Sequence, residues 1–488
     1  MTKFTPTEEQ QAIIDFAQNR TENLAVIARA GAAKTSTLVM LAEALPQVPI
    51  LCLAFNKAIA TEMTERLPKN CKAQTLHSIG YSAWRGFVTK RTTVDGRKVY
   101  KILTKEIKLL DPDDEKEAYG MISDLLRTVG EAKNCGYLPP SFKGHWKSHM
   151  TKEDFWESRP MIPTHLEIML VERTLVASFK AALEGEIDFD DMIYCPALCS
   201  VSWPSSPLTL VDESQDLGPL DQYIISKIVR KNRIIAVGDP LQAIYGFRGA
   251  LSDSMSKLIA RFSMDTLKLT VTFRCGKKIV ENAHWLAPDM RAPDWQIDGE
   301  VNRPMTWSVH DLSPGAAVVC RNNAPLFRLA ICMITEGLAP EIRGRDIVGP
   351  IIKEMKKLGK PKQLPLATLS AIDDWEAAML KKARDGAVGS IKDRAEIMRI
   401  VVNQTPTLGD AQEYLQALVS RDGRIYLMTG HKSKGLEFNE VWFLDPKLCV
   451  IERDQDANIK YVIETRAKHS LNYVSTGTLQ EMADDEDV

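Results

Sequence analysis

The sequence predicts an α/β protein with two parallel-sheet domains, each interrupted by a helical insertion. Apolar segments typical of buried strands alternate with helical segments near the N-terminus, and this alternation indicates a parallel sheet covered by helices. A long block of charged, helical sequence then separates these strands from two later apolar strands. A second α/β pattern follows towards the C-terminus and contains a shorter interruption of its own.

The first domain is predicted at residues 1–94 and 186–275, because strand character stops before residue 95 and returns after residue 185. We expect the first sheet to be completed across the insertion. The expected elements are a strand at LAVIARA (24–30), a helix over Thr35–Ala44, a strand at PILCLAF (Pro49–Phe55), a helix beginning near Asn56, and strands at Leu208–Val211 and Ile234–Val237.

Residues 95–185 are predicted to be a helical insertion, because apolar residues recur there at helical spacing among charged ones. The second domain is predicted at 276–345 and 421–480, with a Lys-rich helical insertion at 346–420 and an acidic tail at 481–488. Its expected strands are AAVVCRN (Ala316–Asn322), RIYLMTG (Arg424–Gly430), VWFL (Val441–Leu444) and LNYV (Leu471–Val474).

The bulk properties indicate a soluble, multidomain protein. A chain of 488 residues exceeds one compact core, since domains average roughly 150 residues. The net charge of −2 means that a nucleic-acid partner must be held by a local basic groove. No signal segment precedes the first strand, and no apolar run approaches the roughly 20 residues that a membrane span needs. We therefore expect a cytoplasmic, nucleoid-associated protein without a membrane partner.

A candidate phosphate-binding loop, ARAGAAKTST (Ala28–Thr37), lies between a predicted strand and a predicted helix. Such a loop needs backbone N–H groups at a helix N-terminus, a lysine for the β- and γ-phosphates and a hydroxyl for Mg²⁺. Lys34 and Thr35 supply the last two. The residues expected to contact nucleotide here are Ala30, Gly31, Ala32, Ala33, Lys34, Thr35 and Ser36.

Ala33 occupies a position where the phosphate-loop template has glycine. If the backbone there needs a positive φ, or if phosphate must approach closely, the methyl group costs about 1–2 kcal/mol. Slower turnover, weaker ATP binding and a relaxed loop are all open outcomes.

Adjacent carboxylates, Asp212 and Glu213, follow an apolar strand directly. Strand ends are where nucleotide enzymes hold Mg²⁺ and orient water. We expect Asp212 to bind the metal together with Thr35, and Glu213 to act as the base that orients the attacking water. Gln242, near the end of the next strand, is expected to sense the γ-phosphate.

Two aromatic residues and an arginine follow closely: Tyr245, Phe247 and Arg248. Aromatic rings and arginine are the residue types that stack on and clamp unpaired bases. Either ring taken alone would more often belong to a core, but their position directly after Gln242 favours contact with a single strand.

Together these segments resemble superfamily 1 helicases of the UvrD/Rep type, including the F-box-helicase-like branch and phage versions. The resemblance implies two RecA-like domains with ATP and Mg²⁺ bound between them. It rests on these further segments: TPTEEQQAII near the N-terminus, AFNKAIATEM (Ala54–Met63), QTLHSIG (Gln74–Gly80), FDDMI (Phe189–Ile193), VTFRCGKKIVENA (Val271–Ala283), TGHKSKGLEF (Thr429–Phe438) and NIKYVIETRAKHSL (Asn458–Leu471).

The resemblance also implies roles in nucleotide binding. Gln10 would read the adenine edge, and Phe273 would lie under the adenine ring. Arg274 and Arg466 would act on the γ-phosphate as catalytic arginine fingers, and Glu437 would bind the ribose. Glu464 stands where the family pattern is apolar, so packing beside Arg466 is expected to differ.

A single-stranded DNA track is implied as well, although His77 and His431 are equally compatible with structural roles. The residues that would line this track are Phe55, Asn56, Thr75, His77, Tyr245, Phe247, Arg248 and His431.

The implied function is an ATP-dependent, 3′→5′ translocase and DNA helicase in repair, recombination or replication, encoded by a bacterium or phage. It would act as a monomeric motor on single strands and single–double-strand junctions, with replication or repair proteins as partners. A slow regulatory ATPase that strips nucleoprotein complexes without unwinding is the alternative, and an RNA track stays open because stacking does not distinguish it.

Overall fold

The structure is a computed structural model that describes residues 5–54, 56–142, 144–244, 253–452 and 455–483. The chain forms two compact units, and each is described by itself below. The first unit comprises residues 1–28, 33–159 and 163–269, and the second comprises residues 29–32, 160–162 and 270–488.

The first unit is built on a sheet of six strands in the order β3-β2-β6-β7-β1-β8. All neighbours are parallel, and Val26 in β1 lies opposite Val237 in β7 and Leu267 in β8. Central strands of this sheet are apolar because helices cover both faces. The strand bounds are β1 Leu24–Ala28, β2 Ile50–Ala54, β3 Cys71–Thr75, β6 Leu208–Val211, β7 Arg233–Gly238 and β8 Asp265–Leu269.

Local signals start the helices of this unit. The Thr7 hydroxyl accepts from the Gln10 backbone N–H, and the Gln10 side chain accepts from the Thr7 N–H, which forms a capping box for α1. Asn56 likewise occupies the N-cap position, at the start of α3. The helix bounds are α1 Glu8–Asn19, α2 Lys34–Glu43, α3 Lys57–Arg66, α4 Leu76–Phe87, α10 Asp191–Leu198, α11 Pro219–Val229 and α12 Ser254–Phe262, with 3₁₀ turns η1 Ser214–Asp216 and η2 Pro240–Gln242.

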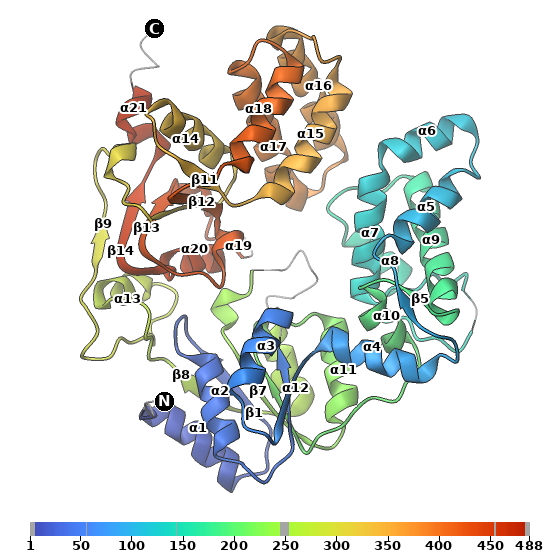
Figure 1. Cartoon of the computed structure of the whole chain (residues 1–488), viewed down its shortest axis with the longest axis vertical. Helices are drawn as coiled ribbons and strands as arrows, with labels where there is room; N and C mark the ends of the chain where they lie inside the picture. The colour runs from blue at the N-terminus through green and yellow to red at the C-terminus, as the bar shows by residue number, and fades with distance from the viewer. Residues whose placement is uncertain (1–4, 55, 143, 245–252, 453–454, 484–488) are drawn as a thin grey trace. The chain divides into compact units, whose positions relative to one another are not determined.

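Five helices form a separate helical layer within the first unit, drawn in cyan to green in Figure 1. They share a core that includes Leu103, Val129 and Leu170. Their bounds are α5 Lys98–Ile107, α6 Pro112–Gly120, α7 Ile122–Cys135, α8 Lys152–Glu157 and α9 His165–Leu183, and the parallel pair β4 Thr93–Val94 and β5 Glu186–Ile187 flanks them.

The second unit has its own six-stranded parallel sheet in the order β11-β12-β10-β13-β14-β9. The helices α15–α18 pack on one another and share a core with α14. The strand bounds are β9 Glu300–Asn302, β10 Ala317–Cys320, β11 Pro340–Ile342, β12 Ile425–Thr429, β13 Phe438–Leu444 and β14 Ala467–Val474. The helix bounds are α13 Lys277–Ala283, α14 Ala324–Thr335, α15 Arg345–Leu358, α16 Pro365–Lys382, α17 Asp385–Asn403, α18 Leu408–Ser420, α19 Gly430–Ser433, α20 Asp456–Glu464 and α21 Gln480–Ala483.

The predicted fold class, two parallel-sheet α/β domains, is confirmed. Every strand that the sequence predicted is present, whereas β3, β8, β9, β11 and the short pair β4 and β5 escaped prediction. The first four are the two edges of each six-stranded sheet, and edge strands such as β3 (CKAQT) and β8 (DTLKL) carry polar residues that break an apolar run. The domain boundaries drawn from the sequence stay predictions.

Candidate nucleotide-binding site

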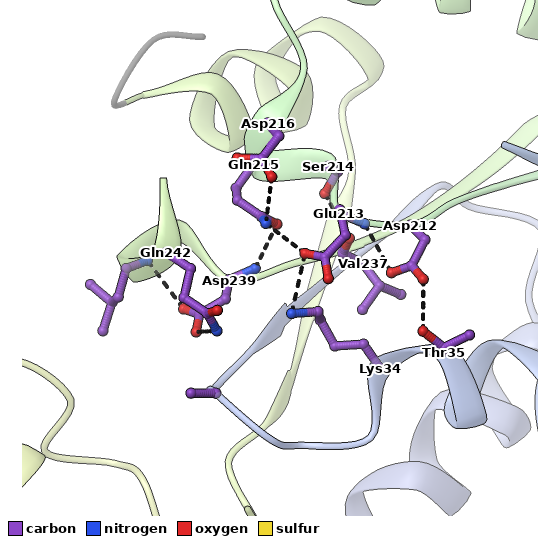
Figure 2. A network of polar contacts seen from close by, with 12 residues as sticks. Lys34, Thr35, Asp212, Glu213, Ser214, Gln215, Asp216, Val237, Asp239 and Gln242 are labelled. Atoms are coloured by element: carbon purple, nitrogen blue, oxygen red, sulfur yellow. Dashed lines mark hydrogen bonds and ion pairs between the residues drawn. The ribbon is translucent and has the colours of Figure 1, made fainter. Parts of the chain in front are cut away.

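The carboxyl ends of neighbouring strands bring the candidate residues of the first unit to one edge of the sheet (Figure 2). Val211, the last residue of β6, lies opposite Leu53 in β2 and Ala236 in β7. Because the strands are parallel, Asp212 and Asp239 follow their strands at the same edge. The helix α2 begins at Lys34 beside them.

The backbone at Ala33 is left-handed, with φ 54° and ψ 41°. This is the condition under which the sequence predicted a cost for a residue with a β-carbon. Left-handed backbone positions immediately before a helix aim successive N–H groups outward and form anion-binding concavities. The predicted phosphate loop therefore has a suitable shape, and Ala33 strains it.

Lys34 points at the carboxylates that follow β6. Its Nζ lies 3.3 Å from Oε2 of Glu213, and its side chain is 12% exposed. Burial by itself lowers the pKa of Lys34, but the neighbouring carboxylates, Glu213 first, raise it above its ordinary value. The lysine is therefore held charged at the position where phosphate oxygens would bind.

Thr35 and Asp212 form the second contact across this edge. The Thr35 hydroxyl donates to Oδ2 of Asp212 at 2.9 Å, and Asp212 is 3% exposed. Burial, and then the charge of Glu213, raise the pKa of Asp212 to about 6. A buried carboxylate with this pKa gains from a nearby cation.

These oxygens fit Mg²⁺, which binds through one or two protein oxygens and completes its shell with phosphates and water. Across the residues described, no group of three or more His, Cys, Asp or Glu side chains could hold a metal ion. The pair of Thr35 and Asp212 is consistent with that sparse type of site, because ATP would supply further ligands.

A hydrogen-bond network connects Glu213 to Gln242 (Figure 2). Gln215 Nε2 donates to Glu213 Oε2 at 2.6 Å, and Gln215 Oε1 accepts from the Asp239 N–H at 3.0 Å. Gln242 Nε2 then donates to Asp239 Oδ2 at 2.6 Å. Glu213 itself adopts left-handed backbone angles, φ 50° and ψ 42°, as functional residues held by their surroundings often do.

Gln215 and Asp239 are site residues that the sequence analysis did not select. The signal for Gln215 was present in DESQD, where a glutamine follows two residues after the proposed base. Asp239 directly follows the apolar strand β7, just as Asp212 directly follows β6. Both are buried, at 1% and 0% exposed.

Gln10 and Ser36 already have protein partners. Gln10 is 3% exposed, and its Nε2 donates to the Thr37 hydroxyl at 3.0 Å. The Ser36 hydroxyl accepts from Arg66 at 3.0 Å. The structure brings Gln10 to α2 but occupies its amide, so its predicted role at the adenine edge stays a prediction.

The second unit contains residues 29–32 of the predicted phosphate loop. The Gly31 carbonyl accepts from the Phe273 N–H at 2.9 Å, and the Ala30 N–H donates to the Tyr461 hydroxyl at 3.1 Å. Gly31 has φ 72°, and a β-carbon there would lie 2.5 Å from the Thr272 hydroxyl oxygen, so only glycine fits. Ala32 closes the turn by donating from its N–H to the Arg29 carbonyl.

Arg274 and Glu437 lie together within this unit. Arg274 Nε donates to Oε2 of Glu437 at 2.9 Å. Lys468 Nζ lies 2.5 Å from Oε1 of the same glutamate. Burial raises the pKa of Glu437, but the hydrogen bonds from Lys468 and Arg274 outweigh it and hold the pKa below its ordinary value. The residues predicted to bind the γ-phosphate and the ribose, Arg274 and Glu437, are therefore neighbours.

Arg466 is 1% exposed and bonded to its own unit. Its guanidinium donates to the backbone carbonyls of Val462 and Leu436, at 2.8 and 3.1 Å. Thr465 links it to Arg274, because the Thr465 carbonyl accepts from Arg274 at 3.3 Å. The structure thus brings the two predicted arginine fingers close together but encloses one of them.

The predicted DNA contacts are only partly described. Asn56 follows β2 and Thr75 ends β3, and both cap the helices that begin there. His77 is exposed in α4, and His431 is half-buried in α19. The other four predicted contacts lie outside the described residues: Phe55, Tyr245, Phe247 and Arg248.

Two parallel-sheet units, one of which presents a lysine, a hydroxyl and adjacent carboxylates at its strand ends, are typical of the P-loop class of nucleotide-binding proteins. Residues 7–263, more than half of the 488-residue chain, match the UvrD/REP helicase N-terminal domain. Residues 424–474 match the UvrD-like helicase C-terminal domain. The chain belongs to the UvrD/REP helicase family.

The chain is similar to several DNA helicases along most of its length. It is 23% identical to F-box DNA helicase protein 1 of Schizosaccharomyces pombe, an alignment that covers 95% of this chain and 57% of that protein. It is 27% identical to F-box DNA helicase 1 of Gallus gallus, with 95% and 48% covered. DNA helicase IV of Escherichia coli is 26% identical over 54% of this chain and 45% of that protein. The chain thus spans about half the length of these relatives.

Among the residues that the structure describes, no helix combines the length and the apolar character that crossing a bilayer requires.

Proposed function

We propose that the chain is an ATP-dependent DNA helicase that travels 3′→5′ on single-stranded DNA. It acts at single–double-strand junctions in repair, recombination or replication. One observation carries the proposal: Lys34, Thr35, Asp212 and Glu213 meet at one sheet edge in a member of the UvrD/REP helicase family. The relatives named as DNA helicases support DNA as the track.

In the first unit, each side chain has a role that its geometry supports. The charged Lys34 binds β- and γ-phosphate oxygens, and Glu213 orients the water that attacks. Gln215 holds the Glu213 carboxylate in place. Mg²⁺, held by Thr35 and Asp212, would supply positive charge to the phosphate oxygens.

In the second unit, Arg274 supplies charge to the γ-phosphate and Glu437 binds the ribose. Both side chains reach the surface, at 16% and 43% exposed, so each can exchange its present partner for nucleotide. Arg466 must give up backbone carbonyls before it can reach a phosphate. A family-type arginine finger contributes about 10³–10⁵ in rate.

The test compares ATP hydrolysis by the whole chain with and without single-stranded DNA. The parent protein should be stimulated by DNA, and Lys34→Met should abolish hydrolysis, whereas Lys69→Met on the exposed surface should not change it. Strand displacement on duplexes with 3′ or 5′ tails then gives polarity, and opening of the 5′-tailed duplex alone would overturn the direction. RNA in place of DNA distinguishes the track. Absence of stimulation by either nucleic acid would refute the motor.

The left-handed Ala33 favours a second candidate, a slow regulatory ATPase that remodels nucleoprotein complexes without unwinding. This candidate requires little hydrolysis in the parent and recovery in Ala33→Gly. Fast, DNA-stimulated hydrolysis together with strand displacement by the parent chain would eliminate it.

A further inference from the structure

Two chain segments of the second unit, which begin near Val271 and Arg291, run side by side. Val271 pairs with Arg291 in a parallel bridge, and the Thr272 N–H donates to the Arg291 carbonyl at 2.8 Å. Six residues further along, the Lys277 N–H donates to the Ile297 carbonyl at 3.0 Å. Hydrogen bonds at both ends therefore fix the register between the two segments.

This register places Trp295 beside Phe273. The two ring centroids are 6.3 Å apart, and the ring planes meet at 25°. The Gln296 side chain donates to the Cys275 carbonyl at 3.2 Å, and its backbone N–H closes a turn onto Pro293 at 2.9 Å. The hydrogen bonds that precede and follow Trp295 along its segment therefore keep its ring beside the ring of Phe273.

Both rings of this pair are open to solvent. Trp295 is 70% exposed and Phe273 is 38% exposed. A stacked aromatic pair held by backbone hydrogen bonds loses little conformational freedom on binding a flat ligand, which lowers the cost of binding. Nucleobases stack on such rings regardless of their sequence identity.

We propose that Trp295 is a nucleotide-binding residue that, with Phe273, forms a two-ring aromatic surface for the base of ATP. The inference rests on the proposed function and on the place under adenine that the family resemblance implies for Phe273; neither assigns a role to Trp295. The neighbouring groups favour a nucleotide as the ligand. Arg274 follows Phe273 directly, and its guanidinium lies 2.9 Å from the carboxylate of Glu437, so groups suited to phosphate and ribose adjoin the rings.

The experiment measures binding of fluorescent ADP, labelled on the ribose with a methylanthraniloyl group, to the whole chain without hydrolysis. Trp295→Ala should raise Kd about 10-fold, the effect expected for one lost stacking ring. Trp295→Phe should recover most of the affinity. Ile297→Ala is the matched control, because Ile297 is also exposed and lies in the same segment.

Two further readouts separate this role from a structural one. Trp295→Ala should raise KM for ATP with little change in kcat, while its thermal unfolding midpoint and its affinity for single-stranded DNA stay at the parent values. An unchanged Kd for the labelled ADP would overturn the inference. A loss of DNA affinity with nucleotide binding intact would also overturn it and would reassign the rings to the strand.

Failure of this inference is distinguishable from failure of the proposed function. A parent chain that binds labelled ADP through Trp295 but shows no DNA-stimulated hydrolysis would leave the aromatic site standing and remove the helicase. DNA-stimulated hydrolysis with an unaffected Trp295→Ala variant would do the reverse.

Discussion

The ammonium group of Lys34 lies 3.3 Å from the carboxylate of Glu213, so the proposed phosphate-binding cation and the proposed base are in contact. Glu213 also accepts from Gln215 on the same oxygen. A phosphate that binds Lys34 competes with Glu213 for the same charge. In the proposed function, binding of ATP would therefore leave the carboxylate to Gln215 and to the attacking water.

Glu213→Gln tests this division of roles. The amide keeps the size of the side chain but cannot take a proton, so hydrolysis should fall by about 10²–10⁴-fold. Nucleotide binding should be retained, because Lys34 loses one competing carboxylate. Phosphate release and the Kd of labelled ADP measure the two effects.

Glu65→Gln, on the exposed face of α3, is the matched control and should leave both quantities unchanged. A Glu213→Gln chain that hydrolyses ATP at the parent rate would remove Glu213 from the mechanism. The remaining carboxylates of the edge would then be the candidates.

Ala33→Gly should stabilise the protein. The left-handed backbone at Ala33 costs an L-residue about 1–2 kcal/mol, whereas the added freedom of glycine in the unfolded chain costs about 0.4–1 kcal/mol. The free energy of unfolding should rise by roughly 0.5–1 kcal/mol as the difference of these terms. Urea denaturation measures it.

Ala32→Gly is the control, and it should change the free energy of unfolding in the opposite direction. Ala32 precedes Ala33 in the same loop but does not have a positive φ. Glycine there gains no relief from strain and adds only unfolded-state entropy, so stability should fall. If both variants lost stability equally, the left-handed angle at Ala33 would carry no strain.

Whether a site residue could be predicted from the sequence depends on what brings that residue to the site. Lys34, Thr35, Asp212 and Glu213 were predicted because each follows a strand or starts a helix, and parallel strands bring their ends together. Thr35 and Asp212 are 177 positions apart in sequence, but their contact follows from the parallel topology that the strand pattern predicts.

Residues whose environment depends on one particular side-chain contact or on the pairing of irregular segments were not predictable in the same way. Gln10 meets Thr37, which is 27 residues away in sequence, and nothing local indicates that its amide is occupied. Trp295 acquires its place beside Phe273 only through the pairing of two segments. Single-sequence patterns do not encode such a register.

Lys133 belongs to a buried ion cluster in the first unit. Its Nζ lies 2.5 Å from Asp188 and 2.8 Å from Asp191, and Lys98 lies 2.6 Å from Asp191. Removing one partner of a buried pair leaves an uncompensated charge and costs about 3–5 kcal/mol. Lys133→Met should therefore destabilise the first unit by that amount in urea unfolding.

Lys257→Met provides the comparison, because Lys257 pairs with Asp253 on the surface at 50% and 52% exposed. Surface pairs of this kind contribute little, so this variant should unfold close to the parent. Equal stability of Lys133→Met and Lys257→Met would mean that Lys133 contributes no net stability to the buried cluster.

Glu464, which the sequence analysis marked as a departure from the apolar family pattern, is 0% exposed and connects three elements. Its carboxylate accepts from Trp285, after α13, at 2.9 Å and from Tyr473, in β14, at 2.7 Å. Asn282 in α13 donates to the same Tyr473 hydroxyl at 2.7 Å. The carboxylate thus fixes α13 against α20 and β14.

Glu464→Leu should destabilise the second unit, because two partly buried donors, Trp285 and Tyr473, lose their buried acceptor, and the cost of about 1–3 kcal/mol for a fully buried group is the upper bound for each. Glu464→Gln should be milder, since the amide oxygen can still accept from Trp285 and the amide nitrogen can donate to Tyr473. The two variants separate hydrogen bonding from charge.

The effect of Glu464→Gln should depend on pH. Burial raises the pKa of Glu464, against hydrogen bonds from Tyr473 and Trp285 and the charge of Lys460, which lower it. A raised carboxyl pKa contributes stability fully below the ordinary glutamate value, and this contribution is lost as pH rises through the folded pKa. The parent should therefore lose stability relative to Glu464→Gln between mildly acidic and neutral pH. Urea unfolding of both chains across that range, with Glu413→Gln at an exposed site as the matched control, measures the difference. A parent that instead gains stability relative to Glu464→Gln as pH rises would mean that Glu464 is stabilised as a carboxylate, with Lys460 outweighing its burial.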